Sequence, residues 1–107
     1  MITLFRAVSQ QEKEDYDTHL AFRTGRNTLE AKQFFKTRMA VTSFIDSSME
    51  QNYDPACAHL MIVTVDDDHF DIIQRTTKLD GYDAVHIDED DLPDFNKCVI
   101  FVKQEVL

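Results

Sequence analysis

The chain has 107 residues, of which 11 are Lys or Arg and 20 are Asp or Glu, so its formal net charge is −9. This length predicts one domain spanning residues 1–107, because domains cluster at about 100–150 residues. The acidity lies in one half: residues 1–53 hold seven acids and seven bases, whereas residues 54–107 hold thirteen acids and four bases. Because such a domain is repelled by phosphate backbones and anionic lipid, we expect no direct nucleic-acid binding and no membrane association.

Two cysteines, Cys57 and Cys98, are too few for a disulfide scaffold, and we expect both to be reduced thiols. The amino-terminal residues show neither a charged n-region nor a long apolar h-region. No window approaches the roughly 18 apolar residues of a membrane-spanning helix. The sequence therefore predicts a cytoplasmic protein, or a domain that is made in the cytosol and delivered elsewhere.

The first residues alternate in the period-2 pattern of a strand over residues 2–8. In this strand Arg6 shares a face with the apolar Ile2, Leu4 and Val8. Ser9 and Glu12 then have the spacing of a capping box, in which each side chain bonds the other residue's backbone amide. A helix is expected from here to about His19 or Leu20.

Residues 21–31 read as a loop or a short strand pair, and Lys32 to Thr37 as a strand buried on both faces. Apolar residues at helical spacing predict a helix from Arg38 to Gln51. The apolar run His59 to Val65 predicts a central strand, and Tyr82 to Ile87 another after an Asp80-Gly81 turn.

A turn is expected at residues 90–93, and the last strand at Cys98 to Val102. Strands at both ends and two helices in the first half predict an α+β fold around a mixed or antiparallel sheet.

Metal and nucleophile motifs are sparse. The acidic runs at 66–68 and 88–91 lack the spacing and Gly of a calcium loop, so we interpret them as solvated turns and expect no metal site. The four histidines are scattered, without the i, i+4 pairing that suits zinc. Cys57 and His59 would share a face of one strand, which makes a thiolate pair conceivable, although a plain buried thiol is favoured.

Residues 22–38 differ in kind from the rest of the chain. This segment holds five bases against Glu30, a local net charge of +4, with Phe22, Phe34 and Phe35 between them. Cations grouped with aromatic rings suit a diphosphate or dinucleotide, since charge-assisted hydrogen bonds hold the phosphates while a ring stacks on a heterocycle. The alternative is a basic stretch that pairs with the acidic half of the same domain.

Several short pieces resemble small bacterial ADP-ribosyltransferase-like domains, which occur as standalone proteins and as effector modules of polymorphic toxins. The pieces span nearly the whole chain in order, and they are Leu4–Ser9, Phe22–Gly25, Asn27–Phe35, Leu79–Gly81 and Asp90–Asn96.

This resemblance implies a split-sheet α+β fold with NAD as cofactor in a cleft between the two sheets. It matches Arg6 to a first-strand residue that contacts the NAD phosphates or ribose. It also matches Asn27, Thr28, Lys32 and Phe34 to the second-strand region that holds the nicotinamide ribose. The implied activity is mono-ADP-ribosylation of a macromolecule.

The sequence departs from the family at the catalytic acid. These transferases commonly use a Glu near a late strand, because the ribose becomes positively charged as nicotinamide leaves. Where that Glu is expected, around residues 96–99, the chain offers Lys97. Glu105, Glu89 and Glu30 remain candidates, and the catalytic residue is left unassigned.

A second hypothesis uses the acidic half of the chain. A non-catalytic inhibitor of the phage anti-defence type would present an acidic surface that mimics nucleic acid and binds the basic face of a protein. Its expected contact residues are Asp66, Asp67, Asp68, Asp88, Glu89, Asp90 and Asp91.

Overall fold

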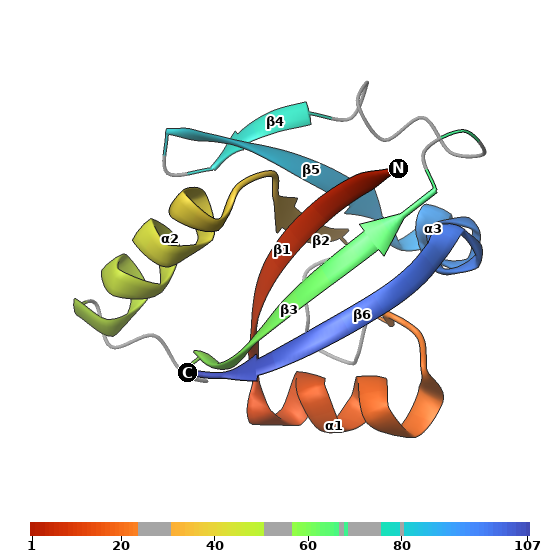
Figure 1. Cartoon of the computed structure of the whole chain (residues 1–107), viewed down its shortest axis with the longest axis horizontal. Helices are drawn as coiled ribbons and strands as arrows, with labels where there is room; N and C mark the ends of the chain where they lie inside the picture. Colours follow the sequence, from red (N-terminus) through yellow and green to blue (C-terminus); the bar gives the residue numbers. More distant parts are fainter. Residues whose placement is uncertain (24–30, 51–56, 67, 69–75, 80) are drawn as a thin grey trace.

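In the part of the chain that this computed structural model describes, which leaves out residues 24–30, 51–56, 67, 69–75 and 80, six strands form one sheet with helices on both faces (Figure 1). The elements in chain order are β1 (Ile2–Ser9), α1 (Gln10–His19), β2 (Ala31–Phe35), α2 (Arg38–Glu50), β3 (Cys57–Val65), β4 (Thr76–Leu79), β5 (Tyr82–Asp88), the 3-10 turn η2 (Glu89–Asp91), α3 (Leu92–Cys98) and β6 (Val99–Val106). The α+β class is therefore confirmed.

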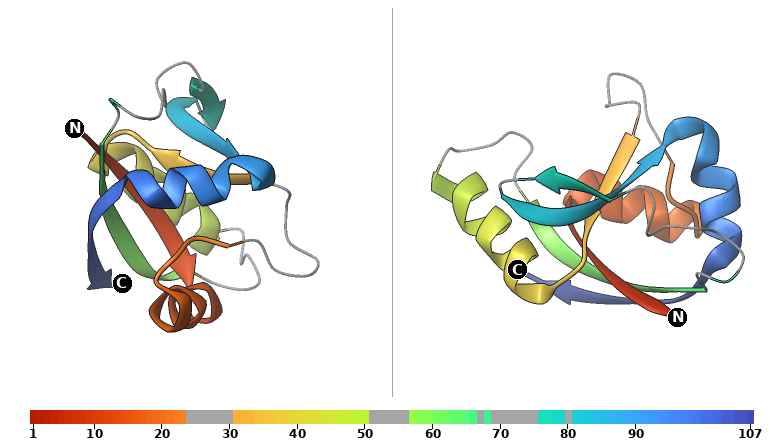
Figure 2. Two further views of the ribbon diagram at one scale, coloured as in Figure 1. Left: turned by 90° about the vertical axis from the view of Figure 1, so that its right-hand side faces the viewer. Right: turned by 90° about the horizontal axis from the view of Figure 1, so that it is seen from above.

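The sheet consists of two half-sheets, β4-β5-β2 and β1-β3-β6, which are joined by a single residue pair. The strand order is β4-β5-β2-β1-β3-β6, and every neighbouring pair is antiparallel. β1 pairs with β3 along its whole length, but the β1–β2 ladder has a single residue pair, Phe5 with Phe35. Figure 2 shows the consequence, with β4 and β5 on one side of the molecule and β3 and β6 on another. Beyond that pair, β1 and β2 diverge.

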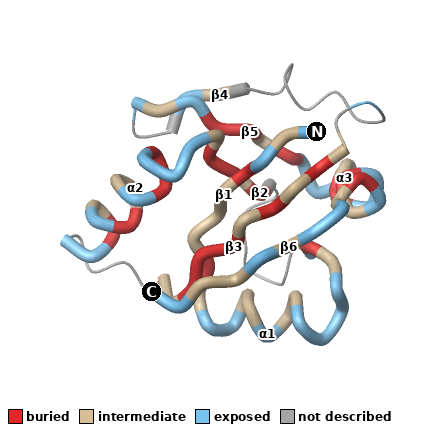
Figure 3. Tube along the Cα trace, in the orientation of Figure 1, coloured by how far each residue is buried: buried red, intermediate tan, exposed pale blue. Residues whose placement is uncertain are grey.

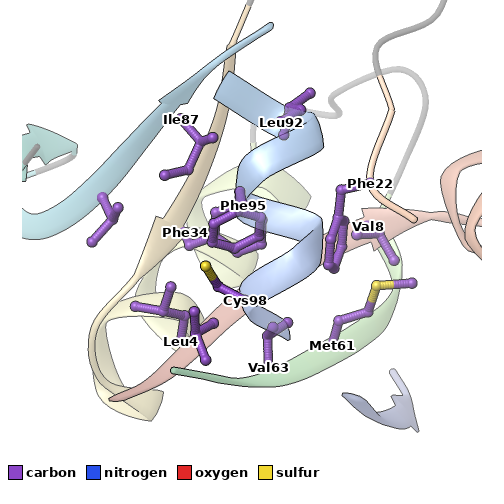
Figure 4. Close-up of a cluster of buried hydrophobic side chains, with 12 residues drawn as sticks. Leu4, Val8, Phe22, Phe34, Met61, Val63, Ile87, Leu92, Phe95 and Cys98 are labelled. Atoms are coloured by element: carbon purple, nitrogen blue, oxygen red, sulfur yellow. The ribbon is translucent and has the colours of Figure 1, made fainter. Parts of the chain in front are cut away.

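Two apolar cores cover the two faces of the sheet. On one face the buried residues of all central strands pack with α3 and Phe22 (Figure 4). On the other face α2 supplies Ala40, Val41 and Ile45 against the sheet. Phe34 and Phe35 are adjacent in β2 and buried on opposite faces, which confirms the expectation of a strand buried on both sides.

The helix α1 begins where the capping box predicts, and half of the box forms. The amide of Glu12 donates to the Ser9 hydroxyl oxygen over 3.2 Å. The reciprocal bond does not form, because the Glu12 carboxylate turns to Arg6 and Lys32 instead. α1 has no fully buried residue (Figure 3). It is attached by the half-buried Tyr16, whose ring contacts Phe22 at the edge of the core, and by polar contacts such as the one between Gln10 and His59.

The predicted helix after β2 is confirmed as α2, and its cap is Thr37, whose hydroxyl accepts from the Ala40 amide. The turn expected at residues 90–93 is wrong, because η2 and α3 occupy this position. Pro93 lies in the first turn of α3, where its missing N–H costs no helical hydrogen bond. β6 is also longer than predicted, since polar residues continue the strand to Val106.

Among the described residues, no helix combines the length and apolar character needed to cross a membrane.

Candidate functional site

The Arg6 side chain connects the two half-sheets where their backbones diverge. Arg6 lies in β1 on the same face as the buried Leu4 and Val8, as its position in the sequence predicts. Its Nη1 donates to the backbone carbonyl oxygen of Gln33 in β2 over 2.8 Å. The guanidinium thus replaces backbone pairing that the two strands do not make.

Glu12 holds the guanidinium from the first turn of α1. Arg6 Nε donates to one carboxylate oxygen of Glu12 over 2.7 Å, and Nη2 donates to the other over 2.8 Å. Such a bidentate pair fixes both position and plane of the guanidinium. The two side chains are 19% and 21% exposed, so the pair is largely shielded from water.

Lys32 adds a second cation beside Arg6 and Glu12, and these three side chains form the Arg6 cluster. Its residue is 6% exposed, and its Nζ lies 3.3 Å from a Glu12 oxygen that also accepts from Arg6. Burial lowers the pKa of Lys32 below its ordinary 10.5, and the charge of Arg6 lowers it further, while Glu12 and Asp15 act in the opposite direction. The fold therefore disfavours the charge that Lys32 carries.

The ring of Phe34 packs against the guanidinium of Arg6. The guanidinium carbon of Arg6 lies 5.7 Å from the centroid of the Phe34 ring, within cation–π range. Phe34 itself is fully buried, with Phe22 and Phe95 as ring neighbours. Its contacts in this structure are with Arg6 and these two rings, and its expected place beside the nicotinamide ribose stays a prediction.

The ionisation of the Glu12 carboxylate makes the free energy of unfolding depend on pH. Burial alone would raise the pKa of Glu12, but the hydrogen bonds and positive charges of Arg6 and Lys32 outweigh it, so the pKa lies below the ordinary 4.5. A carboxyl whose pKa is lower in the folded than in the unfolded state stabilises the fold above the unfolded pKa. That contribution is lost as pH falls through the folded pKa.

We therefore expect the free energy of unfolding, measured by urea denaturation, to fall steeply as pH drops below about 4.5. The Glu12→Gln variant should show a shallower acid slope, because it lacks this titration. Glu14→Gln, on the exposed side of the same helix, is the matched control and should keep the wild-type slope. Equal slopes for all three proteins would contradict the assignment.

Asn96 of α3 holds the start of residues 22–38, the basic segment, by two hydrogen bonds. Its amide nitrogen donates to the Phe22 carbonyl oxygen over 2.9 Å, and its amide oxygen accepts from the Phe22 amide over 2.8 Å. This pair holds residue 22 beside α3, at the entrance to the segment in which Asn27 and Thr28 were expected to contact a cofactor. Asn27 and Thr28 lie outside the described residues.

Three cations of the basic segment form ion pairs with different carboxylates. Arg38 pairs with Glu105 of β6 over 3.1 Å, as the charge-balancing alternative predicts. Arg23 lies 3.9 Å from Asp15 of α1. Only Lys32, of the described segment cations, belongs to the Arg6 cluster.

The described acidic residues of the second hypothesis lie near the two ends of α3. Asp66 is at its carboxyl end, since the Asp66 amide donates to the Cys98 carbonyl oxygen, and residues 88–91 run directly into its amino end. Asp68, Asp88, Glu89 and Asp90 are exposed, Asp66 and Asp91 are half-buried, and Asp67 lies outside the described residues.

The conceivable thiolate pair of Cys57 and His59 is not formed. A bulge at this end of the β1–β3 ladder breaks the alternation of strand faces. Cys57 lies against Ser48 of α2, whereas His59 bonds Gln10 of α1. Among the described residues, no three His, Cys, Asp or Glu side chains gather in a way that could hold a metal ion.

The glutamates that could serve as the catalytic acid differ in their position relative to Arg6. Glu105 is opposite Leu60, which belongs to the core on the α2 face, so Glu105 lies on the other side of the sheet from Arg6. Glu89 follows β5 at the end where Asp88 pairs with Ala31, next to Lys32. Lys97 is exposed near Asp94, and Glu30 lies outside the described residues.

Comparison of the chain with protein families, with characterised proteins and with solved structures finds no significant match. The resemblance to ADP-ribosyltransferase-like domains therefore depends on the short segments themselves.

Proposed function

We propose that the protein binds NAD where β1 and β2 diverge, with Arg6 and Lys32 facing the diphosphate, and that it transfers ADP-ribose to a macromolecule. The observation that carries the proposal is the charge of the cluster. Two cations, Arg6 and Lys32, share one carboxylate, Glu12, at a position largely closed to water. Including the neighbouring Asp15 and Arg23 leaves the local balance at +1.

An anion at this point would offset an energetic cost. Burying a positive charge beside another cation is unfavourable, and the lowered pKa of Lys32 reflects that cost. A diphosphate supplies charge and several acceptor oxygens to the guanidinium and the ammonium together. Asn96 holds Phe22, which precedes Asn27 and Thr28 in the sequence, against the same face of the sheet as Arg6 and Lys32.

The proposed chemistry breaks the bond between the ribose and nicotinamide of NAD. Nicotinamide leaves with the bonding electrons, the ribose carbon becomes positive, and a nucleophile of the target forms the new bond and loses its proton. A carboxylate near that carbon stabilises the positive charge. Glu89 is the described candidate that the β2–β5 register brings to the Lys32 end of β2.

The test is a titration of the protein with NAD followed by amide chemical shifts, combined with incubation of the protein, labelled NAD and a cell lysate. We expect shift changes centred on residues 6, 12 and 32–34, and transfer of label to a protein or nucleic acid. Absence of both NAD binding and transfer would overturn the proposal. Binding without transfer would retain the site and remove the enzymatic activity.

A second candidate function is binding of a basic protein by the acidic surface around α3. It is favoured by the exposed acids at both ends of that helix, with exposed Asp94 between them. In the same lysate experiment, this function predicts capture of a basic protein that receives no label. The complex should weaken as salt concentration rises, because exposed charges are screened.

A further inference from the structure

The outer edge of β6 has the features of a pairing surface for another strand. β6 pairs with β3 on one side, and within the described chain no strand pairs with its other side. Several apolar side chains of β6 are exposed to solvent: Phe101 is 61% and Val106 is 81% exposed. Proteins normally protect such an edge, because its free N–H and C=O groups can pair with a further strand.

The backbone bonds show which residues point outward. The Leu107 amide donates to the Ala58 carbonyl oxygen over 3.0 Å, so residue 107 points its backbone groups towards β3. In an antiparallel ladder this direction alternates, which makes 105, 103 and 101 point inward as well. Val102, Gln104 and Val106 therefore direct their N–H and C=O groups away from the sheet.

The sequence of this edge matches itself when reversed. Around Gln104 the residues are arranged symmetrically in chemical type, so an antiparallel copy centred there pairs like with like. The resulting opposite pairs are Phe101 with Leu107, Val102 with Val106, Lys103 with Glu105, and Gln104 with its own copy. Every charge meets its opposite and every apolar residue meets another.

We propose that two copies of this protein associate through β6, antiparallel and two-fold symmetric about Gln104. The backbone directions suit this register, because Gln104 with Gln104 and Val102 with Val106 become hydrogen-bonded pairs. Centring the pair on Lys103 or on Glu105 instead would place like charges opposite each other, which is unfavourable. The symmetric register extends each sheet into a continuous sheet across both copies.

The contacts that β6 already makes are compatible with this pairing. Gln104 bonds Asp17 of α1 on one face of the sheet, and Glu105 pairs with Arg38 of α2 on the other. Both are side-chain contacts within one copy, and neither uses the outward backbone groups. In the dimer Glu105 would lie between Arg38 of its own chain and Lys103 of the second copy.

A charge-swap series tests the interface and its register. We expect the wild-type mass in analytical ultracentrifugation to rise from one chain towards two between low micromolar and near-millimolar concentration. Lys103→Glu and Glu105→Lys should each weaken association about tenfold, because two attractive pairs become repulsive. The double variant carrying both changes should restore it. Circular dichroism confirms that each variant is folded.

A crosslinking pair of variants fixes the two-fold axis. Gln104→Cys places two thiols opposite each other, with Cα atoms about 5.5 Å apart, so oxidation should give a covalent dimer. Lys103→Cys, offset from its own copy, should not crosslink, and the wild type with its native cysteines sets the background. A wild type that stays monomeric at every concentration, or crosslinking through 103 in place of 104, would overturn the proposal.

Discussion

Replacing Arg6 by Ala should abolish NAD binding and lower the free energy of unfolding by about 3 kcal/mol. The change removes both hydrogen bonds to Glu12 and the bond to the Gln33 carbonyl oxygen. It leaves the shielded Glu12 carboxylate with Lys32 as its remaining described cation. It also removes the side chain that connects the two half-sheets beyond the Phe5–Phe35 pair. Urea denaturation and calorimetric titration with NAD measure the two effects separately.

Arg6→Lys is the matched control. It keeps the positive charge but cannot make the bidentate pair with Glu12, so we expect an intermediate loss of stability and of affinity. Binding is compared at a temperature where all variants are folded. If Arg6→Ala kept both the wild-type stability and the wild-type affinity, Arg6 would have neither role.

Most of the fold could be predicted from local patterns. The alternation in β1, the capping residue Ser9, and the adjacent buried Phe34 and Phe35 each follow from one short stretch of sequence. The helix α3 was missed because its acidic approach and Pro93 resemble a turn. Its burial of Leu92, Phe95 and Cys98 depends on strands far away in the chain, which no local pattern records.

The candidate site was only half visible in the sequence. Arg6 could be selected because a guanidinium on an apolar strand face needs a partner or a ligand. For its partner Glu12 the local sequence predicts a capping role, because that prediction uses only neighbouring backbone groups. Glu12 is only six residues beyond Arg6 in the sequence, so its carboxylate is a nearby candidate partner for the guanidinium. Asn96 could not be connected to Phe22 without the fold.

A substitution of Lys32 tests NAD binding with less effect on folding than a substitution of Arg6. A lysine that is 6% exposed beside another cation lowers stability when charged, so removal of its charge should not harm the fold. Lys32→Met keeps most of the apolar stem and leaves Arg6 and Glu12 as a neutral pair. We expect its free energy of unfolding to equal or exceed that of the wild type, and its affinity for NAD to fall at least about tenfold.

The most direct test of the proposed site is therefore calorimetric titration of NAD into wild type, Lys32→Met and Lys78→Met. Lys78 is an exposed lysine paired with Asp83 on β5, and its replacement controls for loss of overall charge. The proposed site predicts that wild type and Lys78→Met bind NAD equally and that Lys32→Met, although fully folded, binds much more weakly. Equal affinity of all three proteins, or no binding by the wild type, would contradict it.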